Sequence, residues 1–204
     1  GMGEVDGMPA LFGGGKVAGV WVNEQSMLTL SAVWACARLI SETIATLPLS
    51  MYERTSTGRK VATQHPLHAV VHTQPNPNTT AAVHWEACIA AMLLRGNARC
   101  EKLMIGERTV GLVFLVPQRL SRTRRGDGTL EWRYTEEDGR QRVIADSRIW
   151  KLPGFSLDGK DGVSVIRFGA QVFGNALAAS KASGEAFSNG RMQPLYYKIA
   201  EWLK

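Results

Sequence analysis

The sequence predicts an α+β fold, with amphipathic helices packed on antiparallel hairpins and a long helix near the C-terminal end. Two stretches, near 31–47 and 79–95, space apolar residues three and four apart, as one face of a helix does. The stretch 98–152 contains strand-like segments separated by turns, and 164–188 again has a helical pattern. With 204 residues and 45% hydrophobic content, the chain can build one sizeable core or two small ones.

The two ends are expected to differ from the region between them. Residues 1–26 are rich in glycine and methionine and have no period, so we expect a flexible N-terminal arm. Residues 27–194 should form one α+β domain, and 195–204 a short C-terminal helix. We expect no membrane anchor or export signal, because the sequence has no run of about 18 apolar residues and no basic segment followed by an apolar one at its start.

The first long helix is expected over 31–47. Ser31 can cap its start, and Pro48 stops it because proline cannot continue a helix. Its apolar residues form one stripe, which we expect to face the core: Val33, Cys36, Ile40, Ile44 and Leu47. The other side carries Arg38, Ser41 and Glu42. A strand over 48–54, a turn over 56–59 and a short helix over 66–71 should follow.

Residues 73–103, TQPNPNTTAAVHWEACIAAMLLRGNARCEKL, combine a rigid turn, a helix and a break. Pro75 and Pro77 fix their own φ and keep the intervening Asn76 out of the helical region, so this segment forms an elbow. The two threonines that follow can cap a helix, whose expected buried face holds Val83, Cys88, Ile89, Met92 and Leu93. Gly96 and Asn97 should end it, because both tolerate the left-handed conformation, and a strand over 98–104 should follow.

The middle of the chain is expected to be rich in β-structure. Hairpins are predicted around Gly106 and around Asp138 and Gly139, with one more strand over 148–152. A turn at Pro153 and Gly154 then leads to DGKDG at 158–162, which predicts a tight turn. Ser164 can cap a long helix that ends at Asn189 and Gly190. Its many small residues would let a neighbouring element approach closely.

The net charge of +6 raises the question of nucleic-acid binding. Arginines are densest over 119–125, where Arg122, Arg124 and Arg125 are the candidate phosphate contacts. Acidic residues follow within the same segment, so we expect mainly a solvated hairpin and weak contact with nucleic acid. The embedded Arg-Gly-Asp triplet at 125–127 is expected to be a β-turn.

The sequence contains no recognised catalytic motif. The segment FGGGKVA resembles a phosphate-binding loop but lacks its first glycine and its Ser or Thr. His65, His68 and His72 have roughly helical spacing but no cysteine or carboxylate at ligand spacing, so we expect surface histidines, no metal and no cofactor. The three cysteines, Cys36, Cys88 and Cys100, are expected to be reduced core residues.

The order of these signals resembles one known family. The segments SAVWACARLISETIATLPLSMYER, HPLHAVVHTQPNPNTTAAVHWEACIAAMLLRGNARCEKL, LVFLVPQRL, RIWKLPGFSLDGKDGVSVI and AFSNGRMQP together resemble the portal, or head-to-tail connector, proteins of tailed bacteriophages and prophages. The resemblance covers roughly residues 28–194. It implies that the punctuating residues are architectural: Pro75, Asn76, Pro77, Gly96, Asn97, Pro153, Gly154, Gly162, Ser164, Asn189 and Gly190.

The resemblance also implies a function. Portal proteins form a closed, usually dodecameric ring at one capsid vertex, through which the terminase motor drives double-stranded DNA. The implied partners are other copies of the chain, the terminase large subunit, capsid and scaffold proteins, head-completion or adaptor proteins and the DNA. No membrane is involved, and the ring is implied to assemble in the host cytoplasm and to reside in the virion.

The resemblance is incomplete at the C-terminal end. A member of the family would continue beyond NGRMQP with stem helices, a clip and a crown, whereas this sequence ends with LYYKIAEWLK. The expected unit is therefore the outer, wing-like part of a portal subunit, without a catalytic role. Two alternatives remain: a sequence-independent nucleic-acid-binding module using the 119–125 hairpin, and an enzyme with a polar pocket around His65, His68 or His84.

Overall fold

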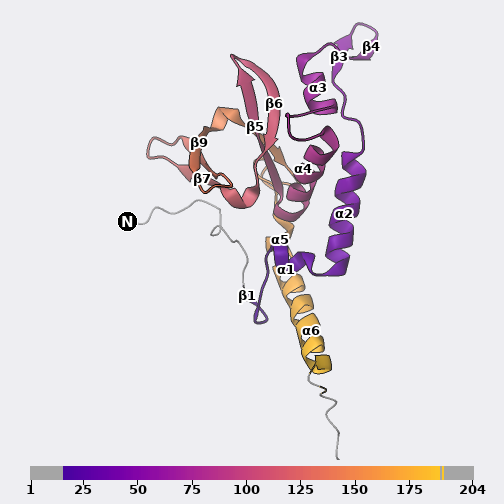
Figure 1. The fold of residues 1–204 in the computed structure, drawn as a ribbon, viewed down its shortest axis with the longest axis vertical. Helices are drawn as coiled ribbons and strands as arrows, with labels where there is room; N and C mark the ends of the chain where they lie inside the picture. Colours follow the sequence, from indigo (N-terminus) through magenta and orange to yellow (C-terminus); the bar gives the residue numbers. More distant parts are fainter. Residues whose placement is uncertain (1–15, 189, 191–204) are drawn as a thin grey trace, which may run out of the picture.

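A computed structural model describes residues 16–188 and 190, and Figure 1 shows an elongated molecule. A long helix extends from one end, and a two-stranded hairpin lies at the other. The helices are α1 (Glu24–Leu28), α2 (Ser31–Ala45), α3 (Pro66–His72), α4 (Ala81–Arg95), α5 (Val165–Phe168) and α6 (Ala170–Ser188), with short 3-10 turns η1 (Pro117–Arg119) and η2 (Asp146–Arg148). Among these described helices, none is long and apolar enough to cross a membrane.

The strands form small antiparallel sheets. One sheet has the order β10-β5-β6, from β10 (Ile149–Pro153), β5 (Asn97–Ile105) and β6 (Arg108–Phe114). A second has the order β7-β8-β9, from β7 (Leu120–Arg124), β8 (Leu130–Thr135) and β9 (Gln141–Ala145). Two hairpins stand apart, made of β1 (Lys16–Val17) with β2 (Val20–Trp21), and of β3 (Tyr52–Thr55) with β4 (Gly58–Val61). The α+β class is therefore confirmed.

The predicted hairpins at Gly106 and Gly139 are present, and both glycines have positive φ, at 59° and 84°. The predicted strand before the C-terminal helix is β10, which pairs with β5. The charged hairpin predicted over 119–125 is present as β7 paired with β8, but it is less solvated than expected. Its Leu120 is buried in a second core with residues of the neighbouring segments: Leu115, Trp132, Tyr134, Ile144 and Ile149.

Helix α2 packs against α4, but through a different face from the one predicted. Ser41 and Ala45 are buried, whereas Ile40 and Ile44 are 41% and 43% exposed. Ser41 satisfies its hydroxyl within the helix by donating to the carbonyl oxygen of Ala37 at 2.8 Å. The expected core stripe is therefore wrong except at Val33, which packs against the core around Val22 and Met27. The side with small residues faces α4, and the rest of the apolar side faces outward.

The predicted buried residues are also only partly correct elsewhere. On α4, Val83 is 56% exposed and Cys88 is 1% exposed, and the other buried positions are Ala81, His84, Trp85 and Ala91. Cys100 is buried as expected, but Cys36 on α2 is exposed. The main core lies where α3 and α4 cover the β5–β6 sheet, and it includes Val70, Ala98 and Leu112.

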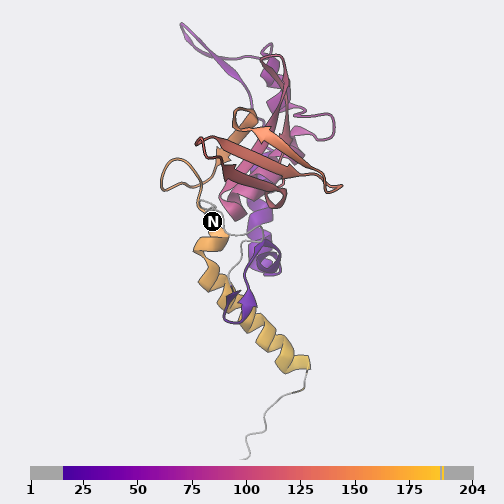
Figure 2. The same cartoon turned by 90° about the vertical axis from the view of Figure 1, so that its left-hand side faces the viewer.

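Part of the expected flexible arm is ordered. Residues 16–21 form the β1–β2 hairpin, and α1 begins at Glu24, so a helix crosses the expected boundary at residue 26. Val22 and Met27 are 0% and 1% exposed and pack with Ile166 of α5. Two buried apolar side chains therefore anchor this segment to the core. The sequence did not predict this, because two apolar residues five positions apart do not establish a helical or strand period. Figure 2 shows the hairpin lying against α6.

The long helix predicted after Ser164 is present. Ser164 caps its start, because its Oγ accepts from the N–H of Arg167 at 3.3 Å. The helix is not continuous, because Gly169 separates α5 from α6. Close approach by a neighbour is confirmed at Gly174, where a Cβ would lie 2.5 Å from the side chain of Val17. Gly190 has φ 58°, whereas Asn189 and the expected helix over 195–204 lie outside the described residues.

Candidate functional site

Several of the predicted architectural residues meet at one place, which we call the glycine junction: Gly96, Asn97, Gly154, Gly162 and Ser164. Gly96 ends α4 in the left-handed conformation, with φ 80°, and the N–H of Gly154 donates to its carbonyl oxygen at 2.7 Å. A Cβ on Gly162 would lie 1.8 Å from that same oxygen, and one on Gly96 would lie 2.5 Å from the backbone of Val163. Side chains therefore have no room between these three backbone segments.

Asn97 and Ser164 complete the junction with side-chain hydrogen bonds. The amide of Asn97 donates to the carbonyl oxygen of Gly162 at 3.0 Å, and its Oδ1 accepts from the N–H of Gly162 at 2.9 Å. The hydroxyl of Ser164 donates to the carbonyl oxygen of Leu94 at 3.3 Å. Pro153 is the register partner of Asn97 in the β10–β5 pair. The junction thus fixes where α5 begins relative to α4 and β5.

The elbow at 75–77 is held in the same way against strand β6. The carbonyl oxygen of Pro75 accepts from the N–H of Leu112 at 2.7 Å, and the amide of Asn76 donates to the carbonyl oxygen of Leu112 at 2.8 Å. A Cβ on Gly111 would lie 2.8 Å from the Pro75 oxygen. Pro75 is fully buried, whereas Pro77 is exposed. The elbow is therefore a fixed contact between α3, α4 and the sheet.

An ion-pair cluster joins the glycine junction to the second sheet. Asp161 binds Arg99 at 3.0 Å through one carboxylate oxygen and Arg122 at 3.3 Å through the other. Both guanidinium groups lie near the ring of Trp132, at 4.9 Å and 5.6 Å from its centroid. Arg99 is 9% exposed, and burial lowers the pKa of its guanidinium against the opposing charge of Asp161. Arg122 thus holds two parts of the fold together.

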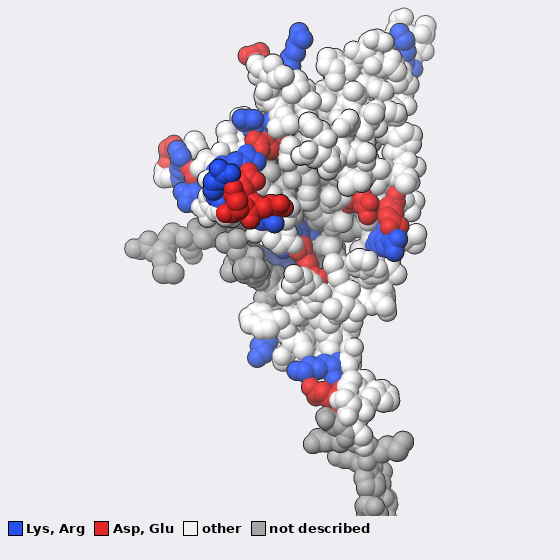
Figure 3. Space-filling view, viewed as in Figure 1, with Lys and Arg blue, Asp and Glu red and all other residues white. Residues whose placement is uncertain are grey.

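The other two predicted nucleic-acid contacts differ from Arg122. Arg125 is exposed and pairs with Glu131, while Arg124 is exposed and has no ion pair among the described residues. Figure 3 shows that charged side chains of both signs gather over the β7–β9 region rather than a single basic patch. The arrangement leaves little uncompensated positive charge on this hairpin.

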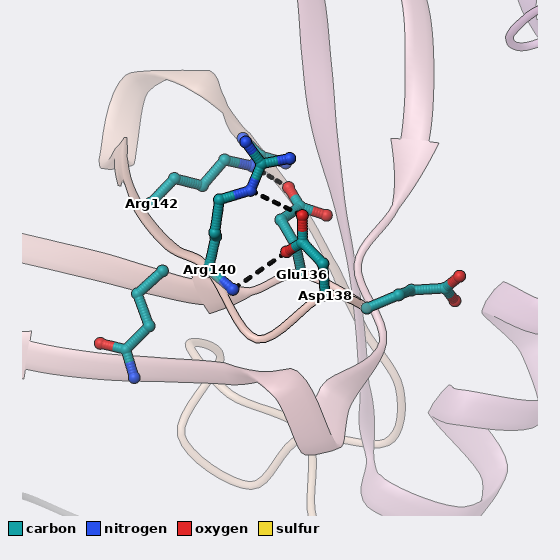
Figure 4. Close-up of a pocket in the computed structure, with 6 residues that line it drawn as sticks. Glu136, Asp138, Arg140 and Arg142 are labelled. Carbon is teal, nitrogen blue, oxygen red and sulfur yellow. Dashed lines mark hydrogen bonds and ion pairs between the residues drawn. The ribbon is translucent and has the colours of Figure 1, made fainter.

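A shallow hollow at the β8–β9 turn is lined by Glu136, Glu137, Asp138, Arg140, Gln141 and Arg142. Figure 4 shows Arg140 turned toward Asp138 and Arg142 toward Glu136. Glu137 pairs with Arg119 at 3.1 Å. Each carboxylate of the hollow therefore faces an arginine, and the described residues bring no nucleophile together with a free general base there.

The histidines expected at the surface include two that stack and one that caps a helix. His68 and His72 have ring centroids 4.9 Å apart, and His65 Nδ1 accepts from the N–H of Leu67 at the start of α3. His84 is different, because it is 2% exposed and lies beside two thiols. Sequence reasoning missed this cluster, although the spacing of His84 and Cys88 by four on a helix could have indicated it.

The cluster consists of His84, Cys88 and Cys100. The Sγ atoms of Cys88 and Cys100 are 3.5 Å apart, and Cys100 Sγ is 3.6 Å from His84 Nε2. The hydrogen bond from Cys100 is the main cause that lowers the pKa of the Cys88 thiol to about 6, against the opposing effect of burial. The same contact raises the pKa of Cys100. One of the two thiols is thus more readily deprotonated than the other.

Two apolar faces are left uncovered in the described chain. The α2 stripe consists of Leu39, Ile40 and Ile44 of α2 with Leu47 just after the helix, which are 67%, 41%, 43% and 61% exposed. The α6 face consists of Phe168 at the end of α5 with Val172 and Phe187 of α6, which are 80%, 69% and 86% exposed. An exposed apolar stripe such as that of α2 is typical of surfaces that bind another protein.

Comparisons with known proteins identify the family. The model of the phage portal protein family matches residues 31–203. The portal protein of Enterobacteria phage HK97 is 28% identical over 88% of this chain and 43% of its own length. A probable portal protein of Streptomyces phage phiC31 is 31% identical over 90% of this chain and 42% of its own length. The chain therefore spans about two fifths of the length of these curated relatives.

A solved structure described as the neck of an empty GTA particle, computed with C6 symmetry, has a similar fold. It is 24% identical to this chain, with a TM-score of 0.65 over 83% of this chain and 48% of its own. The chain belongs to the phage portal protein family, whose members are structural proteins rather than enzymes.

Proposed function

We propose that this chain is the outer, wing-like part of a portal subunit and that the complete protein forms a closed, dodecameric ring at one capsid vertex. The ring conducts double-stranded DNA during packaging and ejection, and it nucleates head assembly. Its partners are further copies of itself, the terminase large subunit, capsid and scaffold proteins, and head-completion or adaptor proteins. The ring assembles in the cytoplasm of the bacterial host and remains in the virion.

The observation that carries this proposal is the uncovered α2 stripe. Burying apolar surface is favourable by about 25 cal/mol per Å². Three apolar side chains lie on one side of α2 and a fourth, Leu47, follows just after its end, yet the described fold covers the opposite side. A second subunit that covers the stripe accounts for both its composition and its direction.

Ring closure requires two different surfaces on each subunit, because a head-to-tail contact repeats by rotation. The α2 stripe and the α6 face supply two such surfaces on separate helices. Figure 1 shows that α6 extends away from the helices and sheets, while α2 lies along the side of the molecule. Each surface is thus accessible without rearrangement of the core.

The rigid contacts of the fold support the same proposal. A closed ring accumulates any error in the angle between subunits, so the elements that carry the contacts must keep a fixed geometry. The glycine junction fixes α5 relative to α4 through backbone contact, and the elbow fixes α4 to the sheet. We therefore interpret the glycines of the junction and the prolines of the elbow as the residues that fix the angle between subunits.

The test uses the full-length protein and its oligomeric mass, measured by light scattering after size exclusion. The double variant Leu39→Glu and Ile44→Glu should remain folded by circular dichroism but lose the ring, because both side chains are exposed in the subunit. Arg38→Glu, at an exposed position on the side of α2 away from Ile40 and Ile44, is the control for an added negative charge and should form rings as the wild type does. Rings of normal mass and yield from the double variant would contradict the assignment of this surface.

A further inference from the structure

The described core contains a set of metal-ligand atoms that the proposed function does not use. His84, Cys88 and Cys100 are 2%, 1% and 0% exposed, and their ligand atoms all lie within 4.8 Å of one another. Free cysteines in a core usually behave as small apolar side chains, and a thiol is a weak hydrogen-bond donor. Here two thiols face each other and an imidazole instead of aliphatic groups, so ligand binding must be considered.

The ligands come from rigid elements. His84 and Cys88 are four residues apart on α4 and therefore share one face of that helix. Cys100 lies on β5, the central strand of its sheet, where its register partners are Trp150 and Phe114. Trp85 packs edge-on against His84, with ring centroids 5.0 Å apart. The three ligand atoms are thus held by the packing of a helix on a sheet and not by loops.

The distances fit a tetrahedral zinc ion. Zinc–sulfur bonds of about 2.3 Å and zinc–nitrogen bonds of about 2.0–2.1 Å, at a tetrahedral angle, separate neighbouring ligand atoms by roughly 3.5–3.8 Å. In the structure, the two Sγ atoms are 3.5 Å apart, and Cys100 Sγ is 3.6 Å from His84 Nε2. Two of the three edges of the ligand triangle therefore already have the required length.

The charge and chemistry of the group favour the same ion. Two thiolates and a neutral imidazole carry two negative charges, which a divalent cation balances, and a buried site strongly disfavours uncompensated charge. Thiolate and imidazole ligands select zinc over magnesium and calcium, which prefer oxygen. Among the described residues the group has three members, so the fourth position of the ion falls to a small molecule such as water.

We propose that His84, Cys88 and Cys100 bind a zinc ion that links helix α4 to strand β5. The ion would replace the contact between the two thiols and would join the helix that follows the elbow to the strand that follows Gly96. Its role is to stabilise the core, so it does not depend on ring formation. Zinc binding to the folded state alone raises its stability by mass action.

The test begins with protein that has been reduced with a phosphine and stripped of metal with a chelator. Addition of Co²⁺ as a spectroscopic probe should produce thiolate-to-cobalt charge-transfer absorption that saturates at one ion per chain, and Zn²⁺ should displace it. Saturating Zn²⁺ should raise the melting temperature by on the order of 5 °C. Cys36→Ser, which removes the exposed thiol, is the matched control and should behave as the wild type does.

The variants Cys88→Ser and His84→Gln should lose the absorption band and the shift in melting temperature. Because such core variants can also fail to fold, alkylation of the wild type provides a second measurement: Zn²⁺ should protect Cys88 and Cys100, whereas Cys36 reacts in both states. The proposal is overturned if Zn²⁺ gives no protection or if metal binding survives in folded Cys88→Ser protein. Two findings together would also overturn it: a disulfide between Cys88 and Cys100 in the purified protein, and no metal binding after that disulfide is reduced.

Discussion

At the scale of single residues, the glycine junction depends on the absence of side-chain atoms. Gly162 approaches the carbonyl oxygen of Gly96 so closely that a Cβ would lie 1.8 Å from it, and the obstructing atom belongs to the backbone. Asn97 then holds Gly162 with two hydrogen bonds. The junction therefore tolerates no side chain at this position without moving either α4 or the turn before α5.

We predict that Gly162→Ala lowers the free energy of unfolding by at least about 2 kcal/mol, because overpacking displaces backbone. Gly184→Ala is the matched control: a Cβ at this position would meet no other group within 4 Å, and the residue lies in helix α6. Alanine is the better helix former by about 1 kcal/mol, so the control should be neutral or stabilising. Urea unfolding of both variants measures the difference, and equal effects would contradict the account of the junction.

A second prediction concerns Ile40. A fully buried isoleucine replaced by alanine costs about 2–5 kcal/mol, which is what a core stripe on α2 would imply. Because Ile40 is 41% exposed, Ile40→Ala should cost less than about 1.5 kcal/mol in the isolated subunit. Thermal unfolding of the unassembled protein is the measurement. A loss above about 2 kcal/mol would mean that the stripe is covered within the subunit.

Helix α2 also shows what the sequence can and cannot predict. Its start near Ser31 and its apolar stripe follow from local spacing, and both are present. The direction of the stripe does not follow, because it depends on which side α4 meets, and α4 meets the side with Ser41 and Ala45. Periodicity identifies an apolar face but not whether its partner is in the same chain.

At the scale of elements, the sequence predicted the turns that need a residue with positive φ. It did not predict which of these turns contact one another. Gly96, Gly106 and Gly139 have the positive φ that their positions required, because this constraint is local. Gly96, Gly154 and Gly162 belong to segments far apart in the sequence. The positions of turn-forming residues do not by themselves predict that these segments meet. The same holds for the His84 and Cys88 pair, whose third member comes from a neighbouring strand.

The two prolines of the elbow should differ in their effect. Pro75→Ala should lower stability by roughly 1–2 kcal/mol, because the ring is fully buried and the unfolded chain gains freedom. Pro77→Ala should lower it by no more than about 1 kcal/mol, because that ring is exposed and only the unfolded-state term applies. Denaturant titration of the single variants measures this. An equal loss at both positions would show that burial of Pro75 contributes nothing.

At the scale of the whole molecule, charge and shape separate the portal assignment from the nucleic-acid alternative. The 119–125 hairpin has acidic partners for Arg119, Arg122 and Arg125. A ring through which DNA slides gains nothing from tight phosphate contacts, and the described fold leaves two apolar faces uncovered. Association with other proteins therefore explains more of the surface than association with phosphate does.

We predict weak binding of duplex DNA at physiological salt, because a few exposed arginines supply only a small, screened attraction. Replacing Arg122, Arg124 and Arg125 together by Ala should change the affinity little. Since Arg122 also supports the fold through Asp161, the double variant Arg124→Ala and Arg125→Ala serves as the folded comparison. Fluorescence anisotropy with a labelled duplex decides the question, and tight binding lost in the double variant would favour the nucleic-acid module.

We propose that this chain contributes the outer part of a portal ring and uses its α2 stripe as a contact between subunits. Electron cryomicroscopy of the full-length protein tests it most directly. We expect a closed ring in which the next subunit covers Leu39, Ile40, Ile44 and Leu47 of each subunit. A protein that remains monomeric under assembly conditions, or a ring in which these four side chains face solvent, would contradict it.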